Sequence, residues 1–232
     1  MQALNQSFNP NTTITVQVWI IVFGCIQLLF SQFPTIHDLR FLNVACTICT
    51  AGFAITTTAL SIYNGHNPPP DSPPVDYSVP GGSAAVTFGV FSALGTIAFG
   101  FGDTILPEIQ ATLKKPIRQN MHKGVHLAFS VIACSYFMTT VSGYWAFGNM
   151  VSPYLVNSFT GPVWAVRLAN FFALLQIIGC YQIYCRPTYE VMEIWAMDTK
   201  QGPLSVRNII GRFIVTLTYI TVLTFIGAIF PL

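Results

Sequence analysis

The chain has 232 residues, of which 53% are hydrophobic and only 8% are charged, and its formal net charge is +2. A soluble domain of this length carries about 25% charged residues, because polar groups must cover its surface. The composition therefore excludes an ordinary water-soluble domain and indicates a protein whose solvent is lipid. The net charge is too small to indicate a nucleic-acid partner, and we expect none.

Six apolar segments of twenty or more residues run along the chain, at residues 14–33, 41–63, 84–110, 124–147, 162–186 and 208–230. Twenty helical residues span about 30 Å, which is the thickness of the hydrocarbon layer. Continuous rather than alternating apolar runs favour helices over the strands of a membrane barrel. The predicted fold is an all-α polytopic membrane protein with about six transmembrane helices, in one transmembrane domain over residues 1–232.

The first two segments, 14–33 and 41–63, contain no Asp, Glu, Lys or Arg. The second is rich in Ala, Thr and Gly, and this composition suits close packing between helices. Cys46 and Cys49 lie within it, and apolar residues surround both. We therefore expect both thiols to be packing residues, and we expect no metal or other cofactor.

The connections between segments predict the orientation of the chain in the membrane. Lys and Arg gather in the connections after the first, third and fifth segments, whereas residues 64–83 and 148–161 contain neither. The positive-inside rule makes the first set cytoplasmic and the second set exoplasmic. Both ends of the chain are then expected on the exoplasmic side. The loop at 64–83 is rich in Pro and Gly, so we expect an exposed connector there rather than a helix.

The third segment, 84–110, carries the features most specific to a function. Gly95, Gly100 and Gly102 weaken the helix, and Pro107 removes a backbone donor. Irregular backbone at membrane depth is tolerated only where it faces protein or a watery cavity. We therefore predict a discontinuous helix, broken near residues 99–102. Its freed carbonyls and its second helix N-terminus would meet the two charged ends of an amino acid.

Two carboxylates lie in or beside this break, and each has more than one interpretation. Asp103 is a candidate for a functional intramembrane acid, and capping of the second half-helix is an equally good interpretation. Glu108 precedes Lys114 and Lys115, and we favour a place at the cytoplasmic interface over proton carriage. The glycines of the segment could also be close-packing positions.

The fifth segment, 162–186, carries the amides of Asn170, Gln176 and Gln182. Hydrogen bonds between helices are the favoured role for these amides, and a place beside the substrate is the second interpretation for Asn170 and Gln176. Arg186 and Arg212 are expected at helix ends on the cytoplasmic side.

Four sequence blocks resemble the amino acid/auxin permease family of plants, and within it the branch of GABA and proline transporters. They are FGCIQLLFSQFPTIHDLRFLN from Phe23, AFGFGDTILPEIQATLKKP from Ala98, GYWAFGN from Gly143 and LQIIGCYQIYCRPTYE from Leu175. The blocks occur in the family's order, and the resemblance covers essentially the whole chain.

The resemblance implies about eleven helices in a LeuT-type arrangement of inverted repeats, of which this chain would supply the fourth to the ninth. It implies proton-coupled symport of a small neutral amino acid such as GABA or proline, with the proton as coupling ion, in the plasma membrane. The broken segment would be the sixth helix, which carries half of the substrate site. The expected substrate-binding residues are Phe99, Gly100, Phe101, Gly102 and Asp103, with Asn170 and Gln176 as secondary candidates.

Two other functions are weighed against transport. Because the family's first three and last two helices are missing, a truncated protein that associates with a full-length permease is one alternative. An intramembrane aspartyl protease is the other, because Gly100-Phe-Gly-Asp103 fits its GxGD pattern. That chemistry needs a second intramembrane Asp, and Asp38, Asp71, Asp76 and Asp198 all lie in predicted loops. We therefore expect a transporter and not an enzyme.

Overall fold

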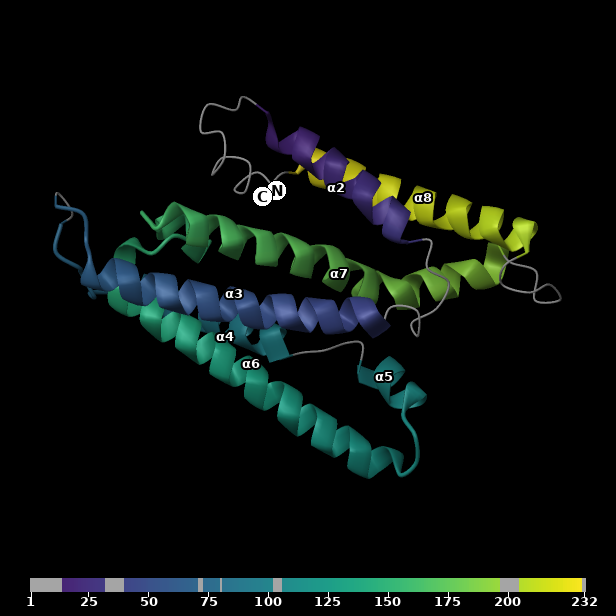
Figure 1. Ribbon diagram of the computed structural model, residues 1–232, viewed down its shortest axis with the longest axis horizontal. Coiled ribbons are helices and arrows are strands. Elements are labelled where there is room, and N and C mark those ends of the chain that lie inside the picture. The colour runs from purple at the N-terminus through teal and green to yellow at the C-terminus, as the bar shows by residue number, and fades with distance from the viewer. Residues whose placement is uncertain are drawn as a thin grey trace. The chain divides into compact units, whose positions relative to one another are not determined.

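The computed structural model describes residues 14–31, 40–70, 73–79, 81–101, 106–196 and 205–230 (Figure 1). The helices are α2 (Val16–Phe30), α3 (Arg40–His66), α4 (Ser83–Phe101), α5 (Leu106–Thr112), α6 (Ile117–Phe147), α7 (Val163–Ala196) and α8 (Val206–Ile229). Two short 3-10 helices, η1 (Gly148–Met150) and η2 (Leu155–Ser158), connect α6 to α7. The described residues include no strand, so the predicted all-α fold is confirmed.

Five of the helices are long and apolar enough to cross a membrane: Phe41–His66, Ser83–Phe101, Ile117–Met150, Val163–Ala196 and Val206–Ile229. The first expected span is shorter than the sequence predicted, because α2 has 15 residues and a length of about 22 Å. Helix α2 begins only after Thr15, whose backbone is extended, and it ends at Phe30. Five full-length helices and one short apolar helix agree with a polytopic membrane protein.

Helix α7 extends ten residues beyond its expected end at 186 and contains Pro187 in its interior. A proline inside a helix removes one backbone hydrogen bond and clashes with the preceding turn. Arg186, the residue before the proline, forms ion pairs with Glu190 and Glu193 further along the same helix.

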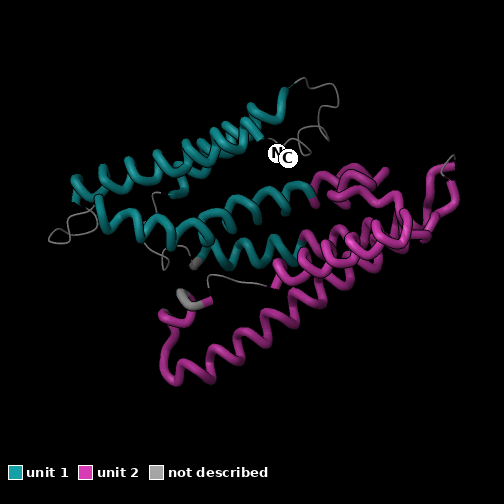
Figure 2. Tube along the Cα trace, turned by 180° about the vertical axis from the view of Figure 1, so that it is seen from behind, with its two compact units in different colours: residues 1–52, 170–232 teal, residues 53–169 magenta. Residues whose placement is uncertain are grey.

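The chain divides into two compact units (Figure 2). Unit 1 comprises residues 1–52 and 170–232, and unit 2 comprises residues 53–169. Helices α3 and α7 each contribute one part to each unit. The two units are described separately below.

In unit 1, close approach at small residues holds the helices together. Helix α2 lies beside α8 (Figure 1), and a Cβ added at Gly24 would lie 2.5 Å from the hydroxyl of Thr224. Between α3 and α7, a Cβ added at Gly179 would overlap the sulfur of Cys46. Both Cys46 and Cys49 are buried, as expected of packing residues.

In unit 2, a small apolar core joins α3, the η2 connection and the start of α7. Its buried members are Leu60, Val156, Phe159, Ala165 and Ala169. The side chain of Asn64 fastens the connection to α3, because it donates to the carbonyl of Gly161 at 2.9 Å and accepts from the hydroxyl of Thr160 at 2.8 Å. This core positions the ends of α3, α6 and α7 that are predicted to face the exoplasm.

Candidate functional site

Helices α4 and α5 lie on either side of the predicted break. The described part of α4 runs to Phe101, and that of α5 runs from Leu106 and contains Pro107 and Glu108. Gly102 and Asp103, two of the expected site residues, lie outside the described residues, so the break itself stays a prediction. Pro107 at the second position of α5 suits a helix start, because its missing N–H has no intrahelical partner there.

The end of α4 contacts α6 through aromatic rings within unit 2. The ring of Phe101 meets Phe129 edge-on, with centroids 5.6 Å apart, and it lies 6.3 Å from Tyr136. A Cβ added at Gly100 would lie 3.0 Å from the Tyr136 ring, closer than such atoms normally approach. Glycine at position 100 therefore allows the aromatic contact at the end of α4. Gly95 has no atom within 4 Å of its missing Cβ, so no such contact explains it.

Phe99 points away from this contact. Its side chain is 85% exposed among the described residues, and no residue of α4 is buried. The expectation that the Phe99 ring encloses a ligand therefore stays a prediction. The described part of the chain brings Gly100 and Phe101 together with Tyr136 and Phe129, two aromatic residues that the sequence did not single out.

The two secondary candidates lie on α7 in unit 1, whereas residues 99–101 belong to unit 2. Asn170 is buried and Gln176 is half-buried. The third amide, Gln182, confirms the favoured interpretation of a hydrogen bond between helices. Its amide nitrogen donates to the side-chain oxygen of Gln27 at 2.6 Å and to the Gln27 carbonyl at 2.8 Å. Both glutamines are buried, so each satisfies a polar group that lipid could not solvate.

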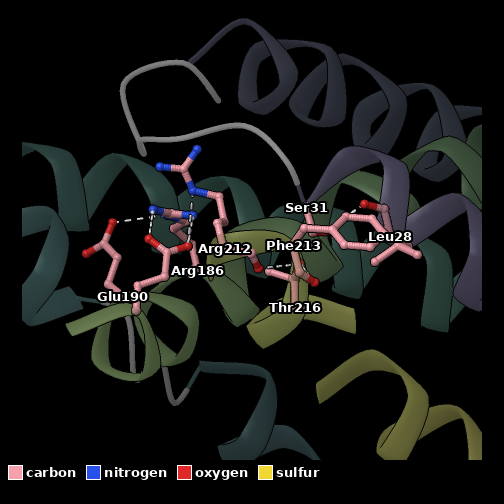
Figure 3. Close-up of polar contacts among 8 residues, drawn as sticks. Leu28, Ser31, Arg186, Glu190, Arg212, Phe213 and Thr216 are labelled. Carbon is pink, nitrogen blue, oxygen red and sulfur yellow. Dashed lines mark hydrogen bonds and ion pairs between the residues drawn. The ribbon is translucent and has the colours of Figure 1, made fainter. Parts of the chain in front are cut away.

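A cluster of charged side chains that was not predicted from the sequence joins α7 and α8 in unit 1 (Figure 3). Arg186 donates through two nitrogens to both oxygens of Glu193, at 3.3 and 3.2 Å, and Arg212 lies 3.4 Å from the same carboxylate. All three side chains are buried, whereas that of Glu190, 3.1 Å from Arg186, is 40% exposed. The expectation that both arginines lie at helix ends is wrong for Arg186, because α7 continues ten residues past it to Ala196, whereas Arg212 lies in the first two turns of α8.

The spacing of this cluster was the signal that could have found it. Arg186, Glu190 and Glu193 follow one another at intervals of four and three residues, which places them on one face of a continuous helix. The signal was hidden because Pro187 suggested that the helix ended there. Buried charges in a membrane helix are costly unless they are paired. Arginines on two helices share the Glu193 carboxylate, and Glu190 is a second partner of Arg186.

At the C-terminal end of α6, a loop segment that we call the strap (residues 73–79) is fastened to the helix. The hydroxyl of Tyr77 donates to the carbonyl of Trp145 at 2.8 Å, and the hydroxyl of Tyr144 donates to the carbonyl of Tyr77 at 2.9 Å. The two tyrosine rings lie 5.5 Å apart. In the connector expected to be exposed, residues 67–70 and 73–79 are exposed, and the strap is also fixed to α6.

Asp76 completes the attachment of the strap. Its carbonyl accepts from the backbone N–H of Asn149 at 2.8 Å, and its carboxylate accepts from the backbone N–H and the hydroxyl of Ser78. The backbone N–H of Ser78, then its hydroxyl and the amide of Asn149, hold the pKa of the Asp76 carboxyl below its usual range. Gly148 has a φ of +53°, and a Cβ there would overlap the Asp76 carbonyl oxygen. These contacts give Tyr144, Gly148 and Asn149 of the block GYWAFGN a structural role, which is to hold the strap.

The helices, the interrupted α4–α5 segment and the buried charges define an integral, multi-pass α-helical membrane protein. The family described as "Transmembrane amino acid transporter protein" matches residues 1–232, and the chain belongs to that family. The chain is 30% identical to GABA transporter 1 of Arabidopsis thaliana over 239 residues, which cover 100% of this chain and 52% of the relative.

Other relatives carry a different substrate in their names. Lysine histidine transporter-like 6 of Arabidopsis thaliana is 30% identical over 95% of this chain and 50% of its own length. Lysine histidine transporter-like 1 of the same plant is 28% identical over 94% of this chain and 48% of its own length. The chain thus spans about half the length of these relatives. No solved structure matches. The relatives are transporters and not enzymes, which agrees with the expectation that this chain is not an enzyme.

Proposed function

We propose that this chain takes part in proton-coupled transport of a small neutral amino acid, such as GABA or proline, across the plasma membrane. The observation that carries the proposal is membership of an amino acid transporter family, whose model matches residues 1–232. The glycines and the proline of residues 84–110 support it, because they predict a broken helix there. Broken helices bind substrates in transporters, because half-helix ends present unpaired carbonyls and amides at membrane depth.

The proposed binding residues divide into two roles. The backbone of Phe99, Gly100, Phe101 and Gly102 would accept hydrogen bonds from the substrate ammonium, and Asp103 would add a negative charge beside it. The aromatic rings of Phe101 and Tyr136, which lie at the end of α4, would border the substrate's apolar body. Asn170 and Gln176 on α7 are proposed as secondary contacts.

A compact neutral amino acid suits this set of residues better than lysine or histidine. Phe99, Gly100 and Phe101 supply apolar surface and backbone acceptors, and their side chains carry no charge. A cationic side chain would need a second negative charge or a route to water. Similarity to a relative named for GABA supports this choice, although other relatives are named for lysine and histidine.

Reconstitution of the full chain into lipid vesicles tests the proposal. Uptake of labelled GABA, proline and lysine is measured with the external medium acidic and the vesicle interior alkaline. GABA or proline should accumulate above the level reached without a proton gradient, a protonophore should abolish the accumulation, and lysine should not compete. Uptake that is absent or independent of the gradient would overturn proton coupling, and preferential uptake of lysine would overturn the proposed substrate class.

A further inference from the structure

A cavity of about 340 Å³ lies in unit 2, beside the strap and the ends of α3 and α6. This volume falls within the range of small-molecule pockets, about 300–1,000 Å³. Its walls include the rings of Pro68, Pro69, Pro73 and Pro74, together with Phe147 and Met150. The cavity lies on the side predicted to be exoplasmic, at the C-terminal end of α6, whereas the Gly100 contact with Tyr136 lies nearer the middle of that helix.

The side chains that line the cavity offer no unused hydrogen-bond donor. Asn64 donates its two amide hydrogens to the carbonyls of Leu60 and Gly161, at 2.8 and 2.9 Å. Thr160 donates its hydroxyl to the side-chain oxygen of Asn64 at 2.8 Å. The prolines have no N–H, and the remaining lining side chains are apolar. A carboxylate or phosphate would therefore meet no side-chain donor here, and burying it would be costly.

The charges around the cavity favour a cation over an anion. Residues 64–83 and 148–161, which form the connections on this side, contain no Lys or Arg. Val75 of the strap lines the cavity, and the next residue, Asp76, is the acidic residue nearest to it in sequence. Phe147 adds an aromatic ring, and the faces of aromatic rings attract organic cations.

The wall of the cavity is also fixed before any ligand binds. The strap is held to α6 by the reciprocal hydrogen bonds of Tyr77 and Tyr144 and by the contact of Asn149 with the Asp76 carbonyl. The four prolines restrict their own backbone. Ordering this surface when a ligand binds would therefore cost little free energy, which favours binding of a small molecule.

We propose that this cavity is a binding site for a small organic ammonium ion with a compact apolar body. The apolar body would contact the proline rings and Met150, and the ammonium group would lie toward Phe147 and the acceptors of the strap. The site is separate from the interrupted segment between α4 and α5, and it does not depend on the proposed transport function.

Equilibrium binding to the full chain in detergent micelles tests the proposal with three probes of one shape. Cyclohexylammonium should bind saturably, cyclohexanol about tenfold more weakly, as loss of a cation–π contact implies, and cyclohexanecarboxylate not at all. Equal binding of the alcohol and the ammonium would overturn the role of charge. Preference for the carboxylate, or no saturable binding of the ammonium, would overturn the site itself.

Two substitutions locate the binding. Met150→Trp would fill the cavity, and because this side chain is 77% exposed the change should not disturb folding. It should weaken cyclohexylammonium binding at least about tenfold, whereas Met138→Trp, at a 60% exposed position of α6 outside the cavity, should leave it unchanged. Phe147→Leu should weaken the binding of cyclohexylammonium until its affinity equals that of cyclohexanol. Unchanged binding to Met150→Trp would show that the probe binds elsewhere and would overturn the assignment.

Discussion

Neutralising Glu193 should destabilise the protein far more than neutralising Glu190, although both carboxylates contact Arg186. The side chain of Glu193 is 7% exposed and pairs with two arginine side chains that are each 4% exposed. Glu193→Gln would remove the carboxylate that both arginines contact in the protein interior and would leave Arg186 with the 40% exposed Glu190 as its ion-pair partner. Removing one partner from a buried ion pair costs about 3–5 kcal/mol.

Glu190 is the matched control, because it lies three residues away on the same helix and contacts the same arginine at 3.1 Å. Its side chain is 40% exposed, so water solvates the charge in part, and pairs of this spacing contribute about 0.3–0.5 kcal/mol. Glu190→Gln should therefore lower the free energy of unfolding by no more than that amount.

The assay is reversible unfolding in mixed detergent micelles, followed by tryptophan fluorescence and far-ultraviolet circular dichroism. A third variant separates loss of an attraction from burial of an unpaired charge. Arg212→Met added to Glu193→Gln should recover part of the lost stability, because it removes one of the positive charges that Glu193 contacts. Equal destabilisation by the two single variants, or no recovery in the double variant, would refute the reasoning.

Three further predictions concern the strap and the buried glutamines. Gly148→Ala should loosen the strap, because residue 148 has a φ of +53° and a Cβ would overlap the Asp76 carbonyl; faster proteolysis of residues 73–79 checks this, and an unchanged rate would contradict it. The Asp76 carboxyl has a lowered pKa, so its contribution to the strap should be complete above about pH 4 and lost as the pH falls through its folded-state pKa. The rate of cleavage in the strap should accordingly be constant from pH 5 to 8. The protection that the Asp76 carboxylate gives should be lost only at lower pH, and a change in the cleavage rate near pH 6 would refute this. Gln182→Leu should destabilise unit 1 by about 1–3 kcal/mol, because it leaves the buried Gln27 oxygen without its donor, and Gln27→Leu combined with it should cost less than the sum of the two single changes.

The sequence predicted the helices well because lipid imposes a simple rule on them. Each apolar run of twenty residues must satisfy its backbone internally, so its length and composition are enough to place α3, α6 and α8. The amide of Gln182 was interpreted correctly for the same reason, since a buried amide in a membrane helix needs a partner. The break predicted after α4 from its glycines and a proline stays a prediction, because residues 102–105 lie outside the described residues.

The long-range contacts could not be predicted in the same way. Asp76 and Asn149 lie 73 residues apart, and nothing in the local composition of either indicates that they meet. The ion pairs of Arg186 were missed because Pro187 is normally a helix-terminating residue, yet α7 continues past it to Ala196. The contact of Gly100 with Tyr136 likewise depends on how two helices pack, which the pattern along one helix does not record.

The central claim, that the interrupted α4–α5 segment binds the amino acid, is tested most directly by the effect of Asp103→Asn on uptake. Labelled GABA and proline uptake is measured in cells that express the chain, with the amount of protein at the cell surface quantified in the same samples. Asp76→Asn serves as the control, because it removes a carboxylate from the strap and not from the interrupted segment. The account predicts that Asp103→Asn abolishes uptake at normal surface expression while Asp76→Asn retains it. Normal uptake by Asp103→Asn would contradict the account.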